Sequence, residues 1–179
     1  MPETYHLKVA GLERELPICP VNDKLDIAGF IMFGDVELTI ACARELLKKV
    51  PDFDVILTAE AKSIPLVYEM SRQTGKKYYP ARKKVKAYML DPVVINTRTI
   101  TTAGDQTLCI DQSELDEMAG KRILIVDDVI STGGALKALE EIAAHTTGTV
   151  VGKAAVLAEG DAGDRTDIIY LEKLPLFFK

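Results

Sequence analysis

Residues 122–142 constrain the fold of this chain more than any other stretch. They read RILIVDDVISTGGALKALEEI, and residues 123–126 are apolar in the way that suits a strand buried on both faces. Two carboxylates follow, Asp127 and Asp128, and a turn of small residues occupies 132–134. Apolar residues at helical spacing come next: Leu136, Leu139 and Ile142. This order of strand, acidic pair, turn and helix places polar groups at the edge where a parallel sheet binds ligands.

Three interpretations of the acidic pair can be compared. In a response-regulator receiver such a pair closes the first strand, whereas here only a short remainder of the chain follows it. The glycine patterns of the common nucleotide loops, GxxxxGK[ST] and GxGxxG after a strand, are absent from the sequence. The third interpretation fits the chemistry: carboxylates accept hydrogen bonds from ribose hydroxyls and suit the shell of a magnesium ion. The glycines of the turn then let backbone N–H groups close around a phosphate.

Composition sets the class of protein. A chain of 179 residues with 47% hydrophobic and 27% charged residues predicts one globular domain with a real core. A net charge of −5 argues against a general nucleic-acid binder. No signal peptide or long apolar run is present, so we expect neither secretion nor membrane insertion. The cysteines match no metal or redox spacing, and we expect reduced core thiols in the cytoplasm: Cys19, Cys42 and Cys109.

The first half of the chain predicts a hairpin followed by strand-loop-helix units. Alternation over residues 5–18 indicates the hairpin, and the apolar cluster within 20–34 is either core or a cap over a flat apolar ligand. Asp35 is a candidate N-cap for a helix over residues 36–49. A buried strand is expected at 53–59. The following helix should run through Met70, with Pro65 in its first turn and Gly75 at its end.

Two further loops suit an anion. Lys62 and Ser63 lie beside the free amides of a predicted helix N-terminus. The basic run at residues 82–86 directly follows a short predicted strand at 78–81. This run is either a solvated surface or an anion site, and its place at the strand's carboxyl end favours the anion site.

The second half predicts a lid and the rest of a parallel sheet. Residues 87–106 show no helical period, and long irregular loops in compact domains are often lids. We expect a returning strand at 107–110 and a short helix at 113–118. Further strands are expected at 149–158 and 168–171, before an apolar C-terminal tail that packs down.

VDDVISTGG resembles the phosphoribosyl pyrophosphate (PRPP) signature of the type I phosphoribosyltransferases. TAEAKSIPL occupies the place of that family's pyrophosphate loop, and ARKKVK resembles the basic run of its adenine-specific members. The resemblance covers roughly residues 54–157. It implies an α/β fold with a central, mostly parallel sheet flanked by helices, a flexible loop, and an N-terminal hood. One domain would span residues 1–179, with the hood at about 1–35 and the core at 36–179.

The resemblance also implies roles for particular residues. Asp127 and Asp128 would hold the ribose hydroxyls and organise Mg²⁺, and with Lys86 they are the residues expected to carry catalysis. The residues expected around the 5-phosphate are Ser131, Thr132, Gly133, Gly134 and Ala135. Those expected to contact or neutralise the pyrophosphate are Ala61, Lys62, Ser63, Arg82, Lys83 and Lys86.

The implied activity is transfer of 5-phosphoribosyl from PRPP to a purine base, with a homodimer as the assembly. Adenine-specific members carry glutamate, tyrosine and glycine in the flexible loop, whereas the best match here is Thr102-Ala103-Gly104. The sequence therefore leaves the base open, although residues 20–33 and Glu159-Gly160 are expected to contact it. Two alternatives remain, a PRPP-sensing regulator without turnover and a pyrimidine or orotate phosphoribosyltransferase.

Overall fold

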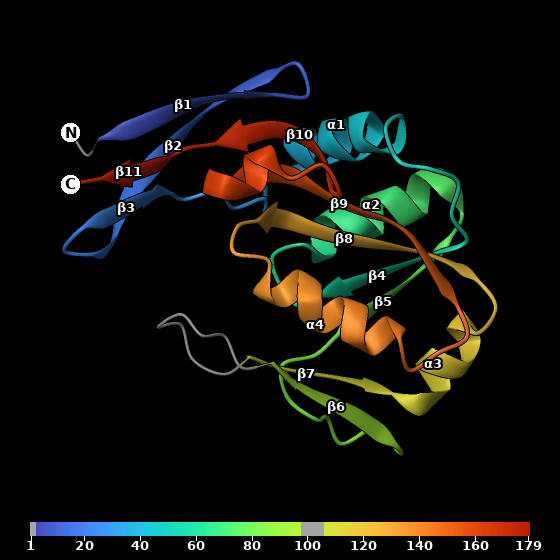
Figure 1. Cartoon of the computed structure of the whole chain (residues 1–179). Helices are drawn as coiled ribbons and strands as arrows, with labels where there is room; N and C mark the ends of the chain where they lie inside the picture. The colour runs from blue at the N-terminus through green and yellow to red at the C-terminus, as the bar shows by residue number, and fades with distance from the viewer. Residues whose placement is uncertain (1–2, 98–105) are drawn as a thin grey trace.

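A parallel sheet forms the centre of the molecule. The computed structural model describes residues 3–97 and 106–179. The sheet has the order β10-β9-β8-β4-β5, and all neighbouring strands run parallel (Figure 1). Its strands are β4 (Val55–Ala59), β5 (Lys77–Ala81), β8 (Arg122–Ile130), β9 (Thr149–Glu159) and β10 (Ile169–Leu174). The expected α/β class is thereby confirmed.

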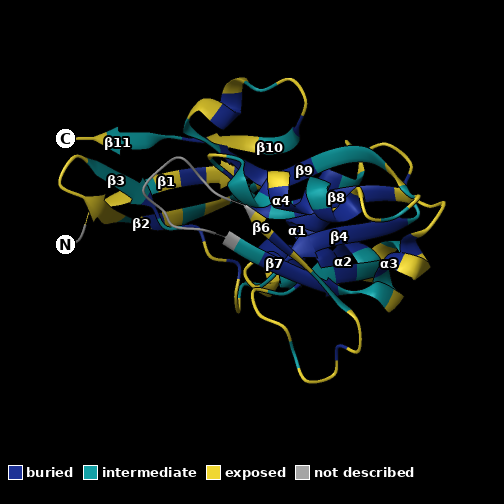
Figure 2. Cartoon of the chain, turned by 60° about the horizontal axis from the view of Figure 1, so that its bottom comes forward, coloured by how far each residue is buried: buried dark blue, intermediate teal, exposed yellow. Residues whose placement is uncertain are grey.

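Helices cover both faces of this sheet, so the strands are buried on both sides (Figures 1 and 2). On one face, apolar residues of α3 and α4 pack against alternate strand residues such as Leu57 and Ile125. On the other face, α1 and α2 pack against the intervening residues, such as Ile56 and Leu124. The helical elements are α1 (Val36–Leu47), α2 (Ile64–Thr74), α3 (Gln112–Met118), α4 (Gly134–Ala143) and the short 3-10 helix η1 (Gly160–Asp164).

The predicted helix boundaries have clear local causes. The Asp35 side chain accepts a hydrogen bond from the Leu38 N–H and caps α1, as its position predicted. Pro65 lies in the first turn of α2, and Gly75 ends the helix with a φ of 70°. A left-handed residue at a helix end favours glycine because a side chain would be strained there.

A second sheet, the hood, lies beside the central one. Its strand order is β1-β2-β3-β11, with β1 (Thr4–Val9), β2 (Leu12–Asn22), β3 (Leu25–Ala28) and β11 (Leu176–Phe178). The predicted hairpin is confirmed as β1 and β2. The apolar tail packs down by pairing with β3, so both ends of the chain contribute to the hood (Figure 1). Beyond β3 the apolar cluster is divided, because Phe30 and Met32 are buried whereas Ile31 and Phe33 are exposed.

The predicted lid is only partly irregular. Its residues include a strand, β6 (Pro92–Thr97), which pairs antiparallel with β7 (Gln106–Asp111). Pro92 and Asn96 interrupt the apolar pattern of β6, so the sequence did not predict this strand. The loop match at residues 102–104 lies outside the described residues.

Two other expectations need correction. β8 does not end before the acidic pair but continues through it to Ile130. Cys42 and Cys109 are buried as expected, whereas Cys19 is exposed. Within residues 3–97 and 106–179, no helix has the length and apolarity needed to span a membrane.

The central strand should dominate stability. Ile125 is fully buried in the middle of β8, so Ile125→Ala should lower the free energy of unfolding by about 2–5 kcal/mol through lost contacts and a cavity. Urea denaturation measures this change. Val94→Ala in β6, where the side chain is 43% exposed, is the control and should cost less than about 1 kcal/mol. Equal losses for the two variants would contradict this picture of the core.

Candidate functional site

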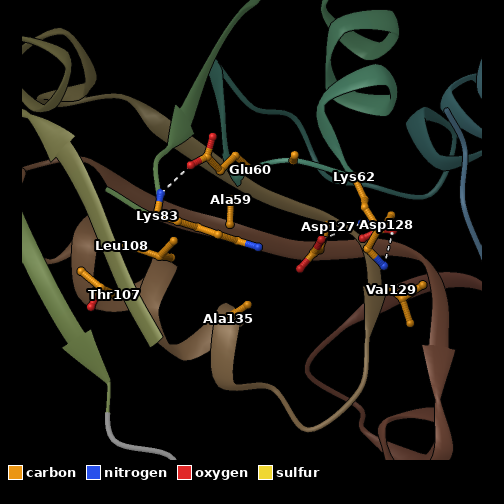
Figure 3. Close-up of a pocket in the computed structure, with 11 residues that line it drawn as sticks. Ala59, Glu60, Lys62, Lys83, Thr107, Leu108, Asp127, Asp128, Val129 and Ala135 are labelled. Atoms are coloured by element: carbon orange, nitrogen blue, oxygen red, sulfur yellow. Dashed lines mark hydrogen bonds and ion pairs between the residues drawn. The ribbon is translucent and has the colours of Figure 1, made fainter. Parts of the chain in front are cut away.

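Three loops meet at the carboxyl edge of the central sheet because β8, β4 and β5 are parallel neighbours. Between them lies a pocket of about 700 Å³ (Figure 3). A smaller pocket of about 180 Å³ is formed by the turn between β8 and α4. Asp127, Val129 and Ala135 line both pockets, so the two hollows are adjacent parts of one site.

The acidic pair has one member buried below the pocket surface. Asp128 is 3% exposed, and its Oδ2 lies 3.4 Å from the Lys62 Nζ. That oxygen accepts no hydrogen bond from residues 3–97 or 106–179. A buried carboxylate with an unused lone pair is costly unless a cation or donor reaches it. Lys62 therefore bridges the β4–α2 loop to the acidic pair of β8.

The other member of the pair, Asp127, has a raised pKa. Burial, followed by the neighbouring Asp128 carboxylate, raises the pKa of Asp127 well above its usual range. Its Oδ1 accepts a hydrogen bond of 2.8 Å from the Asp128 N–H, which acts in the opposite direction. A bound cation or hydroxyl donor would favour the ionised form. The site is therefore electrostatically suited to a ligand that brings positive charge or donors.

The turn between β8 and α4 has the geometry of an anion cradle. Gly133 has a φ of 83°, and α4 begins at the next residue. The residues expected around the 5-phosphate all line the smaller pocket: Ser131, Thr132, Gly133, Gly134 and Ala135. The amides at the start of a helix and the positive end of its dipole both suit a phosphate.

The predicted pyrophosphate loop separates its residues. Ala61 and Lys62 line the larger pocket. Ser63 is only 1% exposed, and its hydroxyl bonds to the Ala59 carbonyl and the Thr58 hydroxyl at 2.8 and 2.7 Å. The Ser63 side chain therefore holds the loop on β4, and only its backbone remains for a ligand.

The basic run is held by a residue that the sequence had not singled out. The Glu60 carboxylate accepts a hydrogen bond from Arg82 Nε at 2.7 Å. It accepts another from the Lys83 N–H at 2.6 Å (Figure 3). Lys83 points into the pocket (Figure 3). Arg82 instead donates to Glu60 and to the Tyr88 hydroxyl. Lys86 is not among the lining residues. Of the four predicted cations, Lys62 and Lys83 therefore line the larger pocket, whereas Arg82 and Lys86 do not.

Glu60 has an electrostatic environment that explains this role. Burial tends to raise its pKa, but the Lys83 N–H and the Arg82 guanidinium outweigh that effect and lower it. In the sequence, the only indication of this role is that Glu60 stands directly after a predicted strand and before Lys62. The basic run that it contacts begins 22 residues later, so the pairing depends on β4 lying beside β5.

The Glu60–Arg82 pair should be energetically coupled. The side chains are 16% and 28% exposed, so their interaction is less screened than a surface pair. In a double-mutant cycle of Glu60→Ala and Arg82→Ala, we expect a coupling of about 1 kcal/mol in the free energy of unfolding. The exposed Glu45–Lys48 pair on α1 is the control and should show a clearly smaller coupling. If the two substitutions changed the free energy of unfolding additively, Glu60 would not hold the basic run through Arg82.

The fold and the site agree with comparisons to known proteins. Residues 37–172 match the phosphoribosyl transferase domain family. An adenine phosphoribosyltransferase of Salinispora tropica is 31% identical over 179 aligned residues, covering 92% of this chain and 93% of that protein. A hypoxanthine/guanine phosphoribosyltransferase of Methanothermococcus okinawensis is 33% identical over 147 residues, covering 75% and 76%. Other matches to adenine phosphoribosyltransferases are shorter and cover 66% and 59% of those relatives.

A solved structure gives independent support for the fold. The adenine phosphoribosyltransferase of Thermoanaerobacter pseudethanolicus superposes with a TM-score of 0.73 at 21% identity, covering 88% of this chain and 95% of that one. The predicted family is therefore confirmed by sequence and fold together. With its acidic pair, glycine turn and parallel sheet in the places described above, this chain belongs to the phosphoribosyl transferase domain family.

Proposed function

We propose that the protein is a PRPP-dependent purine phosphoribosyltransferase that makes a nucleoside monophosphate and releases pyrophosphate. The observation that carries this proposal is the joined pair of pockets. A phosphate-sized turn lies beside two carboxylates and two lysines, which is the set of groups that a phosphorylated ribose with a pyrophosphate leaving group needs. The family membership and the named purine-specific relatives support the same activity.

The smaller pocket and the acidic pair suit the ribose 5-phosphate half of PRPP. The backbone N–H groups of the turn would donate to the phosphate oxygens, because glycine leaves room for a close approach. Asp127 and Asp128 would accept hydrogen bonds from the 2- and 3-hydroxyls of the ribose. The sugar would then lie between the two pockets, with C1 facing the larger one.

The larger pocket suits the leaving group. A ring nitrogen of the base attacks C1 as the bond from C1 to the pyrophosphate oxygen breaks, so negative charge develops on the pyrophosphate. Lys62 and Lys83 are the cations that line this pocket. Preorganised donors at such a charge can be worth about 3–4 kcal/mol each. Arg82 and Lys86 remain proposed contributors that would have to turn inward.

The acidic pair also fits a magnesium ion that arrives with PRPP. Among the described residues no cluster of three His, Cys, Asp or Glu side chains forms a ready-made metal site. Mg²⁺ commonly binds through one or two carboxylates together with substrate phosphates and water. Asp127 and Asp128 would provide those carboxylates, and the Asp128 Oδ2, which accepts no hydrogen bond from the described residues, is a suitable acceptor for the shell. When bound, the ion would neutralise charge on the pyrophosphate.

The base is expected to meet the hood. Residues 20–33 and Glu159-Gly160 are the proposed contacts, and Phe33 exposes 53% of its surface between β3 and α1. An exposed aromatic ring can stack on a purine. The relatives include one named for adenine, at 31% identity over 92% of this chain, and one named for hypoxanthine and guanine, at 33% over 75%, so the base panel covers both kinds of purine.

A panel of bases tests the proposal. Purified protein with Mg²⁺ and PRPP should release pyrophosphate with at least one of adenine, hypoxanthine, guanine and xanthine. Tight binding of PRPP without turnover of any base would favour the regulator instead. Turnover of orotate or uracil alone would identify a pyrimidine enzyme.

Two substitutions test the proposed residues. Asp128→Asn and Lys62→Ala should each lower turnover by more than about tenfold, because each removes a charge expected to face PRPP. Circular dichroism should show that the fold is intact. Lys48→Ala on α1, an exposed lysine that lines neither pocket, is the control and should leave turnover unchanged. Turnover within twofold of the wild type for both site variants would contradict the assignment.

We also propose a homodimer that forms through the outer surface of α1 and α2. Val36, Ile40 and Tyr68 expose 67%, 38% and 57% of their surface along a largely apolar groove of about 390 Å³. Exposed apolar grooves of this kind often mark an interface.

We further propose that the protein is located in the cytoplasm. Cys19, Cys42 and Cys109 form no disulfide, which suits that reducing compartment.

Sedimentation velocity tests the interface. The wild type should sediment as a dimer, and Val36→Glu with Tyr68→Glu should shift it to a monomer because charges would face an apolar partner surface. Leu90→Glu is the control, since Leu90 is 92% exposed and lies outside the groove. A dimer that survives the double substitution would place the interface elsewhere.

A further inference from the structure

A charged network lies behind the phosphate turn and has no part in the roles described so far. Lys153 of β9 donates to Glu140 of α4 at 2.9 Å and to Asp167 at 3.0 Å. Asp167 in turn accepts two hydrogen bonds from Arg165, at 2.9 Å from Nε and 2.7 Å from Nη2. Lys153 is only 17% exposed, so the centre of this network is largely shielded from water.

Arg165 connects this network to the phosphate turn. A methyl group added to the Gly133 Cα would lie 2.8 Å from the Arg165 Nη1, so the guanidinium packs directly on that residue. Within residues 3–97 and 106–179, Arg165 donates to Asp167 from Nε and Nη2, whereas Nη1 donates no hydrogen bond. The guanidinium is therefore fixed at one side by a fork of two bonds and is free at the side that faces the turn.

The network fixes the orientation of Arg165 and favours the charged forms of Arg165 and Asp167. The Asp167 carboxylate raises the pKa of Arg165, and the Arg165 and Lys153 cations lower that of Asp167. Glu140 belongs to the helix whose first turn forms the phosphate cradle, so the network also spans from that helix back to its own N-terminal turn.

We propose that Arg165 is a positioning residue for the 5-phosphate turn, holding Gly133 in its ligand-binding conformation and placing a positive charge behind the bound phosphate. This inference rests on the proposed function of that turn. The turn needs such support because Gly133 has a φ of 83°, and a glycine there can leave the left-handed region easily. Arg165 fills the space that a side chain would otherwise occupy.

The role predicts a selective loss of affinity. Arg165→Met keeps the length of the side chain but removes the fork and the charge. The dissociation constant for ribose 5-phosphate, measured by isothermal titration calorimetry, should rise about tenfold. Affinity for pyrophosphate with Mg²⁺ should change less than about twofold, because Lys62 and Lys83 are untouched. In turnover assays the KM for PRPP should rise while kcat stays within about twofold of the wild type.

A matched pair at the other end of β8 provides the control. Arg122 forms the same kind of fork with Asp54, at 3.1 Å from Nε and 2.9 Å from Nη2, where β8 begins. Arg122→Met should leave both affinities unchanged. Asp167→Asn is a second test, because it keeps the Arg165 charge but weakens the pair of hydrogen bonds that holds the guanidinium. It should raise the dissociation constant for ribose 5-phosphate by about threefold.

The outcomes separate this inference from the proposed function. If the wild type binds neither ribose 5-phosphate nor PRPP, the proposed function fails and the role of Arg165 fails with it. If the wild type binds both, but Arg165→Met matches Arg122→Met or loses ribose 5-phosphate and pyrophosphate equally, only the positioning role is overturned. Thermal melting checks that each variant is folded. If Arg165→Met does not fold, the affinity of Asp167→Asn for ribose 5-phosphate decides whether Arg165 has the positioning role.

Discussion

The buried carboxylate of Asp128 is the constraint around which the site is arranged. A carboxylate that is 3% exposed needs a partner, and the Lys62 Nζ lies 3.4 Å away, on the loop that follows the neighbouring strand. The pairing is possible because β8 and β4 are parallel neighbours that end at the same edge. Lys62 is itself half-exposed and can turn to an incoming anion. In the proposed complex, the Asp128 carboxylate would then accept from a ribose hydroxyl or join the shell of a magnesium ion.

The loops around this pair are each supported from behind. Ser63 fastens the Lys62 loop to β4, and Glu60 clamps the basic run to the same strand. Arg165 packs against Gly133 of the proposed 5-phosphate turn. Ser63 and Glu60 act through short hydrogen bonds and Arg165 through packing, so the backbone of the proposed site needs little reorganisation when a ligand binds.

Local signals in the sequence predicted most of the fold and part of the site. The Asp35 cap, Pro65, Gly75 and the glycine turn act within a few residues of themselves, and each has the predicted structure. Long-range contacts were the ones missed. The roles of Glu60 and Arg165 depend on residues brought close by the sheet, and no spacing in the sequence reveals them. β6 was missed because Pro92 and Asn96 interrupt its apolar pattern.

The two adjoining pockets are proposed to form one PRPP site. A crystal structure of the protein with PRPP and Mg²⁺ tests it directly. We predict that the 5-phosphate lies in the turn at residues 131–135, the ribose hydroxyls on Asp127 and Asp128, and the pyrophosphate against Lys62 and Lys83. A 5-phosphate bound at the basic run, or PRPP bound away from the acidic pair, would contradict the account.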